Sequence, residues 1–255
     1  MKFPILLPNI FNHPFTYESD LDLKVGDYVV VPFGKSKITG VVWDEFEKKN
    51  NKNFKIRTVL KKLNVTPLKK TTIKFLNWFA EYNIIPMGMT LKLVLLSSNA
   101  IENLQKDVFK IFNNSVGANK IKLSEEQKKS LKKMNFSNEK FRVHVLQGTT
   151  GSGKTMVYFS ALKDVIDKGF QGLILLPEIG LTSQFEKKFL EFFGITPAIW
   201  HSGISKKKKE VIWSGIATGD IKVVIGARSS LFLPFKKLGL IIVDEEHDQS
   251  YKQDE

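Results

Sequence analysis

The sequence contains no cysteine among its 255 residues. This absence excludes disulfide bonds, thiolate zinc sites and cysteine nucleophiles. Apolar runs as long as a membrane span are also missing, and Met1–Ile10 is too short and too interrupted by proline for a signal peptide. We therefore expect a soluble, cytoplasmic protein that has no membrane partner.

Acidic residues are scarce relative to basic ones: 26 Asp and Glu stand against 39 Lys and Arg, a formal net charge of +13. Residues 1–122 hold 19 basic and 10 acidic residues, so most of the excess lies there. Such a balance favours a polyanionic partner, with nucleic acid the leading candidate. The alternative is that the charge only follows the composition of a lysine-rich proteome. A hydrophobic content of 42% indicates packed cores, and the length suits two domains.

Residues 148–155 match the phosphate-binding loop pattern, which is a glycine, four further residues and then Gly-Lys-Thr. The apolar, β-prone residues 141–147 before it predict a buried strand. Residues 155–168 after it have apolar positions at helical spacing and predict a helix. The alternative, a glycine-rich turn that meets a lysine by chance, leaves this strand and helix unexplained.

This pattern predicts that ATP and Mg²⁺ are the cofactors. Backbone N–H groups and the helix N-terminus would cradle the phosphates. Lys154 would reach the β- and γ-phosphates, and the Thr155 hydroxyl would bind Mg²⁺. The predicted phosphate-binding residues are Gly148, Thr149, Thr150, Gly151, Ser152, Gly153, Lys154 and Thr155.

A second candidate motif follows the apolar run 239–243, which predicts a buried strand that ends in Asp244, Glu245, Glu246 and His247. Asp244 would hold Mg²⁺ through its water shell. Glu245 would orient and deprotonate the attacking water. The alternative is a solvated acidic turn after a core strand. With Lys154, these two acids are the predicted catalytic residues.

Strands and helices are expected to alternate after the loop, which predicts an α/β fold with a parallel sheet. Its ligand would lie at the carboxyl ends of the strands. Ahead of the loop, Ser124 and Gln127 predict the capping box of a further helix. The expected strands are 172–176, 197–200, 221–225 and 238–243, and the expected helices are 181–193 and 206–217.

The first hundred residues predict a small β-rich domain that is followed by a helix. Strands are expected at 28–32 and 38–44, with a candidate strand at 54–60. Residues 14–17 lead into 21–27, which predict a turn-rich approach to the first strand, and Thr71–Tyr82 predicts a helix with an apolar stripe.

Residues Val29–Lys35, Trp78–Tyr82 and Pro86–Gly88 resemble the N-terminal domain of the PriA family of bacterial replication-restart helicases, which belong to superfamily 2. In that family the domain holds the 3′ end of a nascent DNA strand. The resemblance places Phe15 at the aromatic position of the 3′-end pocket, and Thr16 where the family has an acid. The alternative for Phe15 is a plain core aromatic. The implied pocket residues are Phe15, Thr16, Tyr17, Gly34 and Arg57.

The second half resembles the same family through Asp244–His247 and the residues that follow. This likeness implies a RecA-like motor lobe, with His247 at the ATP site. Superfamily 2 helicases carry a Gln ahead of the loop that reads adenine, and the order in the chain favours that role for Gln127 over capping alone. Segments 176–182, 201–203 and 226–232 resemble motifs that line single-stranded DNA. The implied DNA contacts are Thr182, His201, Ser202, Arg228 and Ser229.

We expect a DNA 3′-end-binding domain at 1–98, a short helical linker at 99–122 and helicase lobe 1 at 123–255. The linker is too short for the winged-helix domain that the family usually places there. The family's second motor lobe and its zinc ligands are not in the sequence, so no zinc site is expected. The resemblance thus implies ATP and DNA binding, with weak hydrolysis and no unwinding by this chain alone.

Three hypotheses stay open. The first is an ATP-dependent 3′-to-5′ DNA helicase of replication restart, present in part, with forked, single-stranded and 3′-ended DNA and primosome proteins as partners. The second is a DNA-binding module with a vestigial ATP site. The third is a P-loop ATPase or translocase of another type. Hydrolysis after addition of the missing lobe separates the first two, and the absence of a preference for DNA ends or forks in residues 1–98 would favour the third.

Overall fold

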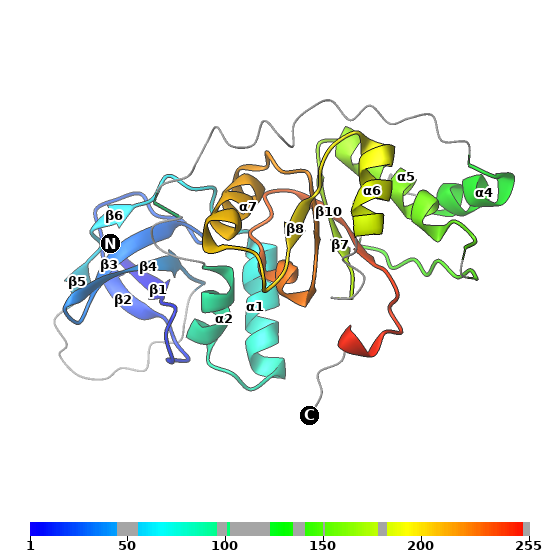
Figure 1. Cartoon of the computed structure of the whole chain (residues 1–255). Coiled ribbons are helices and arrows are strands. Elements are labelled where there is room, and N and C mark those ends of the chain that lie inside the picture. The colour runs from blue at the N-terminus through cyan, green and yellow to red at the C-terminus, as the bar shows by residue number, and fades with distance from the viewer. Residues whose placement is uncertain are drawn as a thin grey trace. The chain divides into compact units, whose positions relative to one another are not determined.

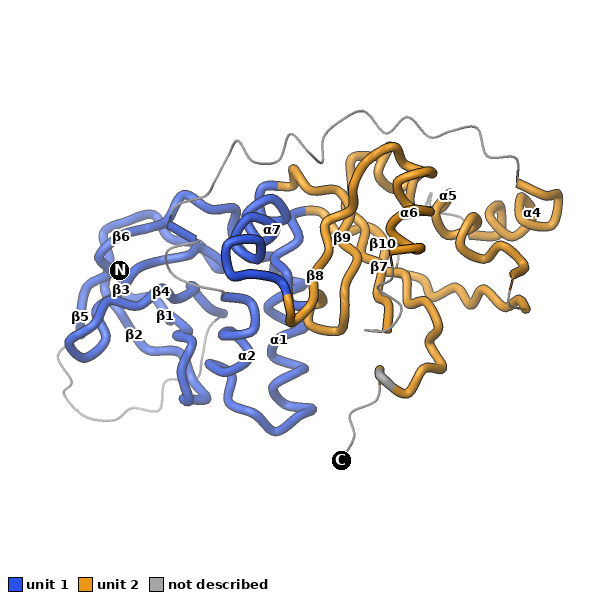
Figure 2. Tube along the Cα trace, in the orientation of Figure 1, with its two compact units in different colours: residues 1–106, 204–218, 232–236 blue, residues 107–203, 219–231, 237–255 orange. Residues whose placement is uncertain are grey.

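The structure is a computed structural model that describes residues 1–44, 56–95, 101–102, 123–134, 141–149, 151–177 and 183–251 (Figure 1). The chain gathers into two compact units, coloured separately in Figure 2. The first unit comprises residues 1–106, 204–218 and 232–236. The second comprises residues 107–203, 219–231 and 237–255.

A six-stranded sheet with the order β5-β2-β1-β4-β3-β6 forms the first unit's β layer. Its pairs are antiparallel except for β2 with β5. The β3–β4 hairpin closes at the pair Phe33 and Ser36, and Gly34 in its two-residue loop has a φ of 60°, which glycine adopts without strain. The strands are β1 (Lys2–Leu6), β2 (Phe15–Glu18), β3 (Tyr28–Phe33), β4 (Ser36–Val42), β5 (Arg57–Thr58) and β6 (Lys61–Lys62).

The strands expected at 28–32 and 38–44 are confirmed as β3 and β4. The turn-rich approach expected at 21–27 is confirmed, because a bend at Leu21 and a turn at Val25 and Gly26 precede β3. Strands β1 and β2, which pair with each other, were not predicted, and Pro4 lies within β1 opposite Thr16. The candidate strand at 54–60 is reduced to β5, and residues 54 and 55 lie outside the described residues.

Helices α1 (Lys70–Tyr82), α2 (Met87–Val94) and α7 (Lys206–Thr218) belong to the first unit, which confirms the helices expected at 71–82 and 206–217. Trp213 on α7 is fully buried. Its indole Nε1 donates to the Val94 carbonyl at 2.7 Å, and its ring meets Tyr28 edge-on at 6.0 Å. A segment far along the chain therefore completes the core of this unit, as Figure 2 shows by its shared colour.

The second unit contains a four-stranded, wholly parallel sheet with the order β10-β7-β9-β8. This confirms the predicted α/β class and parallel sheet. Strands are β7 (Gln171–Leu175), β8 (Ala198–Trp200), β9 (Val223–Gly226) and β10 (Leu238–Val243); helices are α4 (Glu125–Lys133), α5 (Lys154–Asp167) and α6 (Ser183–Phe193); the 3₁₀ turns are η3 (Arg228–Phe232) and η4 (Gln249–Tyr251).

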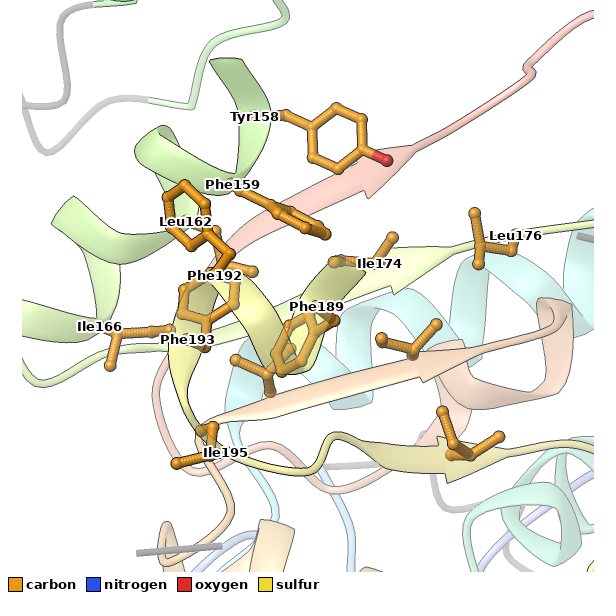
Figure 3. Packing of buried hydrophobic residues seen from close by; sticks show 13 residues of the cluster. Tyr158, Phe159, Leu162, Ile166, Ile174, Leu176, Phe189, Phe192, Phe193 and Ile195 are labelled. Atoms are coloured by element: carbon orange, nitrogen blue, oxygen red, sulfur yellow. The ribbon is translucent and has the colours of Figure 1, made fainter. Parts of the chain in front are cut away.

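A cluster of phenylalanines packs α5 and α6 onto this sheet (Figure 3). The Phe159 ring lies 5.3 Å from Phe193 and 5.6 Å from Phe189, and all three side chains are fully buried. Each such burial contributes roughly 2–3 kcal/mol. Helix α5 also approaches β7 closely, since a Cβ at Gly172 would lie 2.0 Å from the Leu162 Cδ1. The core thus fixes the start of α5 relative to the strand ends.

The strand predicted at 141–147 is wrong: residues 141–149 have no regular secondary structure. Phe141 is 91% exposed and Val145 is 90% exposed. Strand β10 pairs with β7 and is an edge strand of the sheet within the described residues, and Val243 on it is 46% exposed. The apolar residues of 141–147 suit a buried strand, but a strand also needs hydrogen bonds to a neighbouring strand, and that neighbour can come from a distant part of the chain.

We predict that Trp213→Phe destabilises the first unit. The change leaves the buried Val94 carbonyl without its donor and opens a cavity, which together cost about 2–4 kcal/mol. Hydrogen–deuterium exchange of peptides from α2 and α7 should become faster.

Tyr28→Phe is the matched control, because the buried Tyr28 hydroxyl has no hydrogen-bond partner among the described residues. Its removal should leave this exchange unchanged or slower. Equal exchange in Trp213→Phe and the wild type would contradict the assigned role of the indole.

Candidate nucleotide and nucleic-acid sites

The phosphate-loop sequence forms a turn that leads directly into α5. Gly151 and Gly153 have φ values of 82° and 79°, which favour glycine. The backbone N–H of Ser152 donates to the Thr149 carbonyl at 3.2 Å and closes the turn. Gly153 caps α5 with no side-chain hydrogen bond, so the first N–H groups of the helix face outward as an anion site. Thr150 lies outside the described residues.

Lys154, the first residue of α5, folds back over this turn. Its Nζ donates to the Gly148 carbonyl at 2.7 Å and lies 3.4 Å from the Thr149 carbonyl. The ammonium group is therefore held beside the same turn whose N–H groups face outward. This places one positive charge where nucleotide phosphates would need neutralising.

Gln127 joins α4 to the loop, and the predicted capping box is confirmed. The Ser124 N–H donates to Gln127 Oε1 at 2.9 Å, and the Gln127 N–H donates to Ser124 Oγ at 3.2 Å. The amide Nε2 donates to the Ser152 carbonyl at 3.3 Å. Gln127 thus contacts the loop backbone as well as its own helix, and its adenine-reading role stays a prediction.

The acidic motif begins where β10 ends. The Asp244 N–H donates to the Leu175 carbonyl at 3.0 Å, and the Glu245 N–H donates to Asp244 Oδ1 at 3.1 Å. Glu245 has a φ of 49°, a left-handed conformation that costs a side chain roughly 1–2 kcal/mol. His247 Nε2 lies 3.4 Å from Glu245 Oε2 at an exposed position. Strain of this kind gathers at functional sites.

Two tyrosines hold Asp244. The Tyr158 hydroxyl donates to Asp244 Oδ2 at 2.7 Å, and the Tyr251 hydroxyl donates to the Asp244 backbone carbonyl at 2.9 Å. Burial and the neighbouring Asp244 charge raise the pKa of both tyrosines well above the usual range, whereas a hydrogen bond from Thr155 lowers that of Tyr158. Both groups are therefore protonated donors at neutral pH.

Sequence reasoning missed Tyr158. The available signal was its position three residues after Thr155, which puts both side chains on one face of α5 at the loop end. Because Tyr158 lies among apolar helix positions, it was indistinguishable from a core aromatic.

Thr155 and Asp244 are hard oxygen donors: Thr155 lies on α5 three residues before Tyr158, and the Tyr158 hydroxyl donates to Asp244. This donor set fits Mg²⁺, which binds through one or two protein oxygens together with water and nucleotide phosphates. Among the described residues there is no cluster of three or more His, Asp or Glu that could hold a metal ion independently.

The carboxyl ends of the four strands lie in register. Gly226 on β9 pairs with Leu175 on β7 and with Trp200 on β8, while Val243 on β10 pairs with Leu175. The residues that follow each strand therefore share one edge of the sheet with Asp244. This edge is where an open parallel sheet binds its ligands.

Several residues expected to contact DNA follow these strand ends. His201 comes directly after β8, and its Nδ1 accepts from the Gly203 N–H at 3.2 Å. Arg228 comes shortly after β9, and its Nη1 donates to the Tyr251 carbonyl at 3.4 Å. Ser202 and Ser229 are exposed neighbours of these two. Thr182 lies outside the described residues, and the DNA role of the whole set stays a prediction.

The first unit has an aromatic cluster around Phe15. The ring centroid of Phe15 lies 4.9 Å from His13, 5.4 Å from Phe11 and 5.4 Å from Phe33. Phe15 and Phe33 also pack against the buried core, while Phe11 is 41% exposed. Sequence reasoning missed Phe11 and His13. Their signal was the two-residue spacing 11, 13 and 15, which lets extended chain present all three on one side.

Three other expected pocket residues meet at the end of β3. The Tyr17 hydroxyl donates to the Pro32 carbonyl at 3.0 Å, and Arg57 Nη1 donates to the Gly34 carbonyl at 2.9 Å. Burial raises the pKa of Tyr17, and the Arg57 charge opposes that rise. Thr16 is exposed between half-buried Phe15 and buried Tyr17, so strand alternation turns it to the opposite face of β2. The structure thus separates Thr16 from the Phe15 ring.

No helix of the described residues is long and apolar enough to cross a membrane.

Two family models match the chain. A 3′DNA-binding domain model of the PriA type matches residues 4–96, and a DEAD/DEAH box helicase model matches residues 124–255. The loop, the acidic motif and the parallel sheet described above all lie in the second match. The chain belongs to the DEAD/DEAH box helicase family.

The chain is similar to proteins named "Replication restart protein PriA". It is 43% identical to that of Rickettsia conorii over 256 residues, which cover 98% of this chain and 38% of the relative. It is 33% identical to that of Helicobacter pylori over 248 residues, covering 94% of this chain and 36% of the relative. For Bacillus subtilis the identity is 41% over 135 residues, 52% of this chain and 17% of the relative. The resemblance to the N-terminal portion of PriA is confirmed, and the chain spans 38% of the Rickettsia relative.

We predict that Gly153→Ala weakens nucleotide binding. A Cβ at φ 79° is strained and would lie 2.4 Å from Gln127 Nε2, so the loop must shift to relieve it. We expect about tenfold lower affinity for a fluorescent ATP analogue, which corresponds to the cost of the strain.

Gly169→Ala is the control, because Gly169 has a φ of 80° and open space around it at the far end of α5. It should lower the melting temperature and leave the ATP-analogue affinity unchanged. If both variants bind the analogue like the wild type, the loop geometry does not determine binding.

Proposed function

We propose that the chain binds Mg²⁺-ATP at residues 148–155 and 244–245 and binds DNA ends through its first unit. In this proposal it is the front part of an ATP-dependent 3′-to-5′ DNA helicase of replication restart. The observation that carries the nucleotide site is the 2.7 Å hydrogen bond from Tyr158 to Asp244. It brings the phosphate-loop helix and the acidic motif, which are distant in the sequence, into one place.

The roles in the nucleotide site follow from this arrangement. The outward N–H groups at the start of α5 and the Lys154 ammonium bind the phosphate oxygens. Thr155 and Asp244 hold Mg²⁺, which offsets phosphate charge as the γ-phosphate is attacked. Glu245, whose side chain is 54% exposed, takes the proton of the attacking water. Gln127 would reach the adenine from its place beside the loop.

The DNA site is proposed at the aromatic cluster of Phe11, His13, Phe15 and Phe33. Aromatic side chains bind unpaired bases by stacking, and this works with any base because every base has a π-face. Arg57 and the Gly34 turn lie at the end of β3 beside this cluster and would contact the terminal sugar-phosphate. Thr16 lies on the opposite face of β2 from Phe15, so it is not part of this proposed site.

The partners and location are also proposals. The relatives are named for replication restart, which supports forked and single-stranded DNA and primosome proteins as partners, and a cytoplasmic location. Unwinding is proposed for a protein that also carries a second lobe, since strand separation needs two lobes that move against each other. The Haemophilus influenzae relative aligns over 322 residues, longer than this whole chain, which supports the proposal that a winged-helix domain is lacking at 99–122.

A vestigial ATP site is the second candidate. Lys154, Thr155, Asp244 and Glu245 are all present, and the side chains of Lys154 and Asp244 form hydrogen bonds beside the loop and at the strand end. A decayed site would have no reason to keep the strained conformation of Glu245. A P-loop ATPase of another type is disfavoured by the 3′DNA-binding domain match in the first unit.

We predict that Lys154→Ala abolishes ATP binding and spares DNA binding. Removing the ammonium group should cost about a hundredfold in affinity for a fluorescent ATP analogue, since charge-assisted hydrogen bonds to phosphate are lost. Lys168→Ala, at the exposed C-terminal end of the same helix, should bind the analogue normally. Unchanged binding by Lys154→Ala would place the nucleotide elsewhere.

We predict that Phe15→Ala weakens binding to forks that carry a free 3′ end by about tenfold, the value of one stacked base. Forks without that end should bind as before, and the slope of affinity against salt should not change, since no phosphate contact is lost. Fluorescence anisotropy at two salt concentrations measures both quantities. Phe3→Ala is the control, because Phe3 packs against the same core but makes no ring contact with Phe15 within the described residues. Equal losses in both variants would show that Phe15 is only a core residue.

A further inference from the structure

We propose that Tyr158 is a positioning residue of the nucleotide site, whose hydroxyl holds the Asp244 carboxylate in place for Mg²⁺ beside the start of α5. The inference rests on the proposed ATP-binding function and adds a residue that lies outside both the phosphate loop and the acidic motif.

The Asp244 side chain is held at both oxygens. Oδ2 accepts from the Tyr158 hydroxyl at 2.7 Å, and Oδ1 accepts from the Glu245 N–H at 3.1 Å. The Tyr251 hydroxyl fixes the backbone carbonyl of the same residue at 2.9 Å. Hydrogen bonds to a carboxylate are stronger than neutral ones, so the side chain is confined to one rotamer. Each oxygen keeps a further lone pair for the water shell of a cation.

Packing in the core holds the Tyr158 ring in a fixed position. The residue is 7% exposed and is part of the buried cluster that packs α5 onto the sheet. Its ring meets Phe159 edge-on at 5.2 Å. Figure 3 shows the ring at the rim of the cluster, with the hydroxyl oxygen turned away from Phe189 and Phe193. The core thus sets the place of this oxygen independently of any ligand.

The side chain of Asp244 has no such support of its own. Its backbone is fixed at the end of β10 by the hydrogen bond to the Leu175 carbonyl, but Val243 beside it is 46% exposed. Pairing with β7 therefore sets the Asp244 backbone, and the Tyr158 hydroxyl sets the position of its carboxylate relative to α5.

The direction of the hydrogen bond suits a cation. Tyr158 donates to Asp244, so the carboxylate stays an acceptor with lone pairs free for the water shell of a metal. Thr155 lies three residues before Tyr158 on the same face of α5, at the end that meets the phosphate loop. A phenylalanine at 158 would keep the packing and remove the hydrogen bond that holds Asp244 beside this face.

The test compares Tyr158→Phe with the wild type in binding a fluorescent ADP analogue, once with Mg²⁺ and once with EDTA. We expect affinity to fall about tenfold with Mg²⁺, as for a lost hydrogen bond to a charged group, and to stay unchanged in EDTA. Ser160→Ala is the matched control, because Ser160 lies on the same helix and its hydroxyl donates to the Met156 carbonyl of that helix. It should behave as the wild type in both conditions.

The outcomes separate the two proposals. If the wild type shows Mg²⁺-dependent binding and Tyr158→Phe matches it, the inference fails and the proposed function stands. Equal loss with Mg²⁺ and with EDTA would show that Tyr158 acts only on the fold, which also overturns the inference. Failure of the wild type to bind the analogue in either condition would overturn both. In an Asp244→Ala background, Tyr158→Phe should change the Mg²⁺ dependence no further.

Discussion

Strand β7 is the constraint on which the nucleotide site depends. It is buried along its whole length and pairs with β9 on one side and β10 on the other. Because parallel pairing fixes register, the end of β7 sets the ends of both neighbours, and Asp244 hydrogen-bonds directly to Leu175 at that end. The phosphate-loop helix is fixed to the same strand by the close approach of Leu162 to Gly172. One strand therefore places both halves of the site.

The motifs of the nucleotide site could be predicted from the sequence more reliably than the contacts that position them. The phosphate loop and the acidic motif are local patterns, since glycine at positive φ and a lysine at a helix start are written in adjacent residues. The capping box at Ser124 is local in the same way. Tyr158 is not, because its function depends on Asp244, whose position is set by pairing between distant strands. Tyr158 and Asp244 are too far apart in the sequence for a local motif to include both.

The errors have the same origin. Residues 141–147 have the composition of a strand, but composition does not supply a pairing edge. Strand β1 was not predicted, because Pro4 interrupts its pattern and its pairing partners β2 and β4 lie elsewhere in the sequence. The resemblance predicted Phe15 and Arg57 as residues of a 3′-end pocket, and that role stays a prediction. Strand alternation then turned Thr16 away from Phe15, which a list of pocket positions does not reveal.

Trp213 has a consequence for how this chain can be divided. Helix α7 lies within the residues that match the helicase family. The indole of Trp213 on this helix, however, donates to Val94 in the core of the first unit, which contains the DNA-binding match. A fragment made by cutting between the two matches would lack this tryptophan and would expose Tyr28 and the end of α2 to water. The two sequence modules are therefore not two folding modules. Replacing either segment with the corresponding segment of a relative would therefore require that the contacts of Trp213 also be preserved.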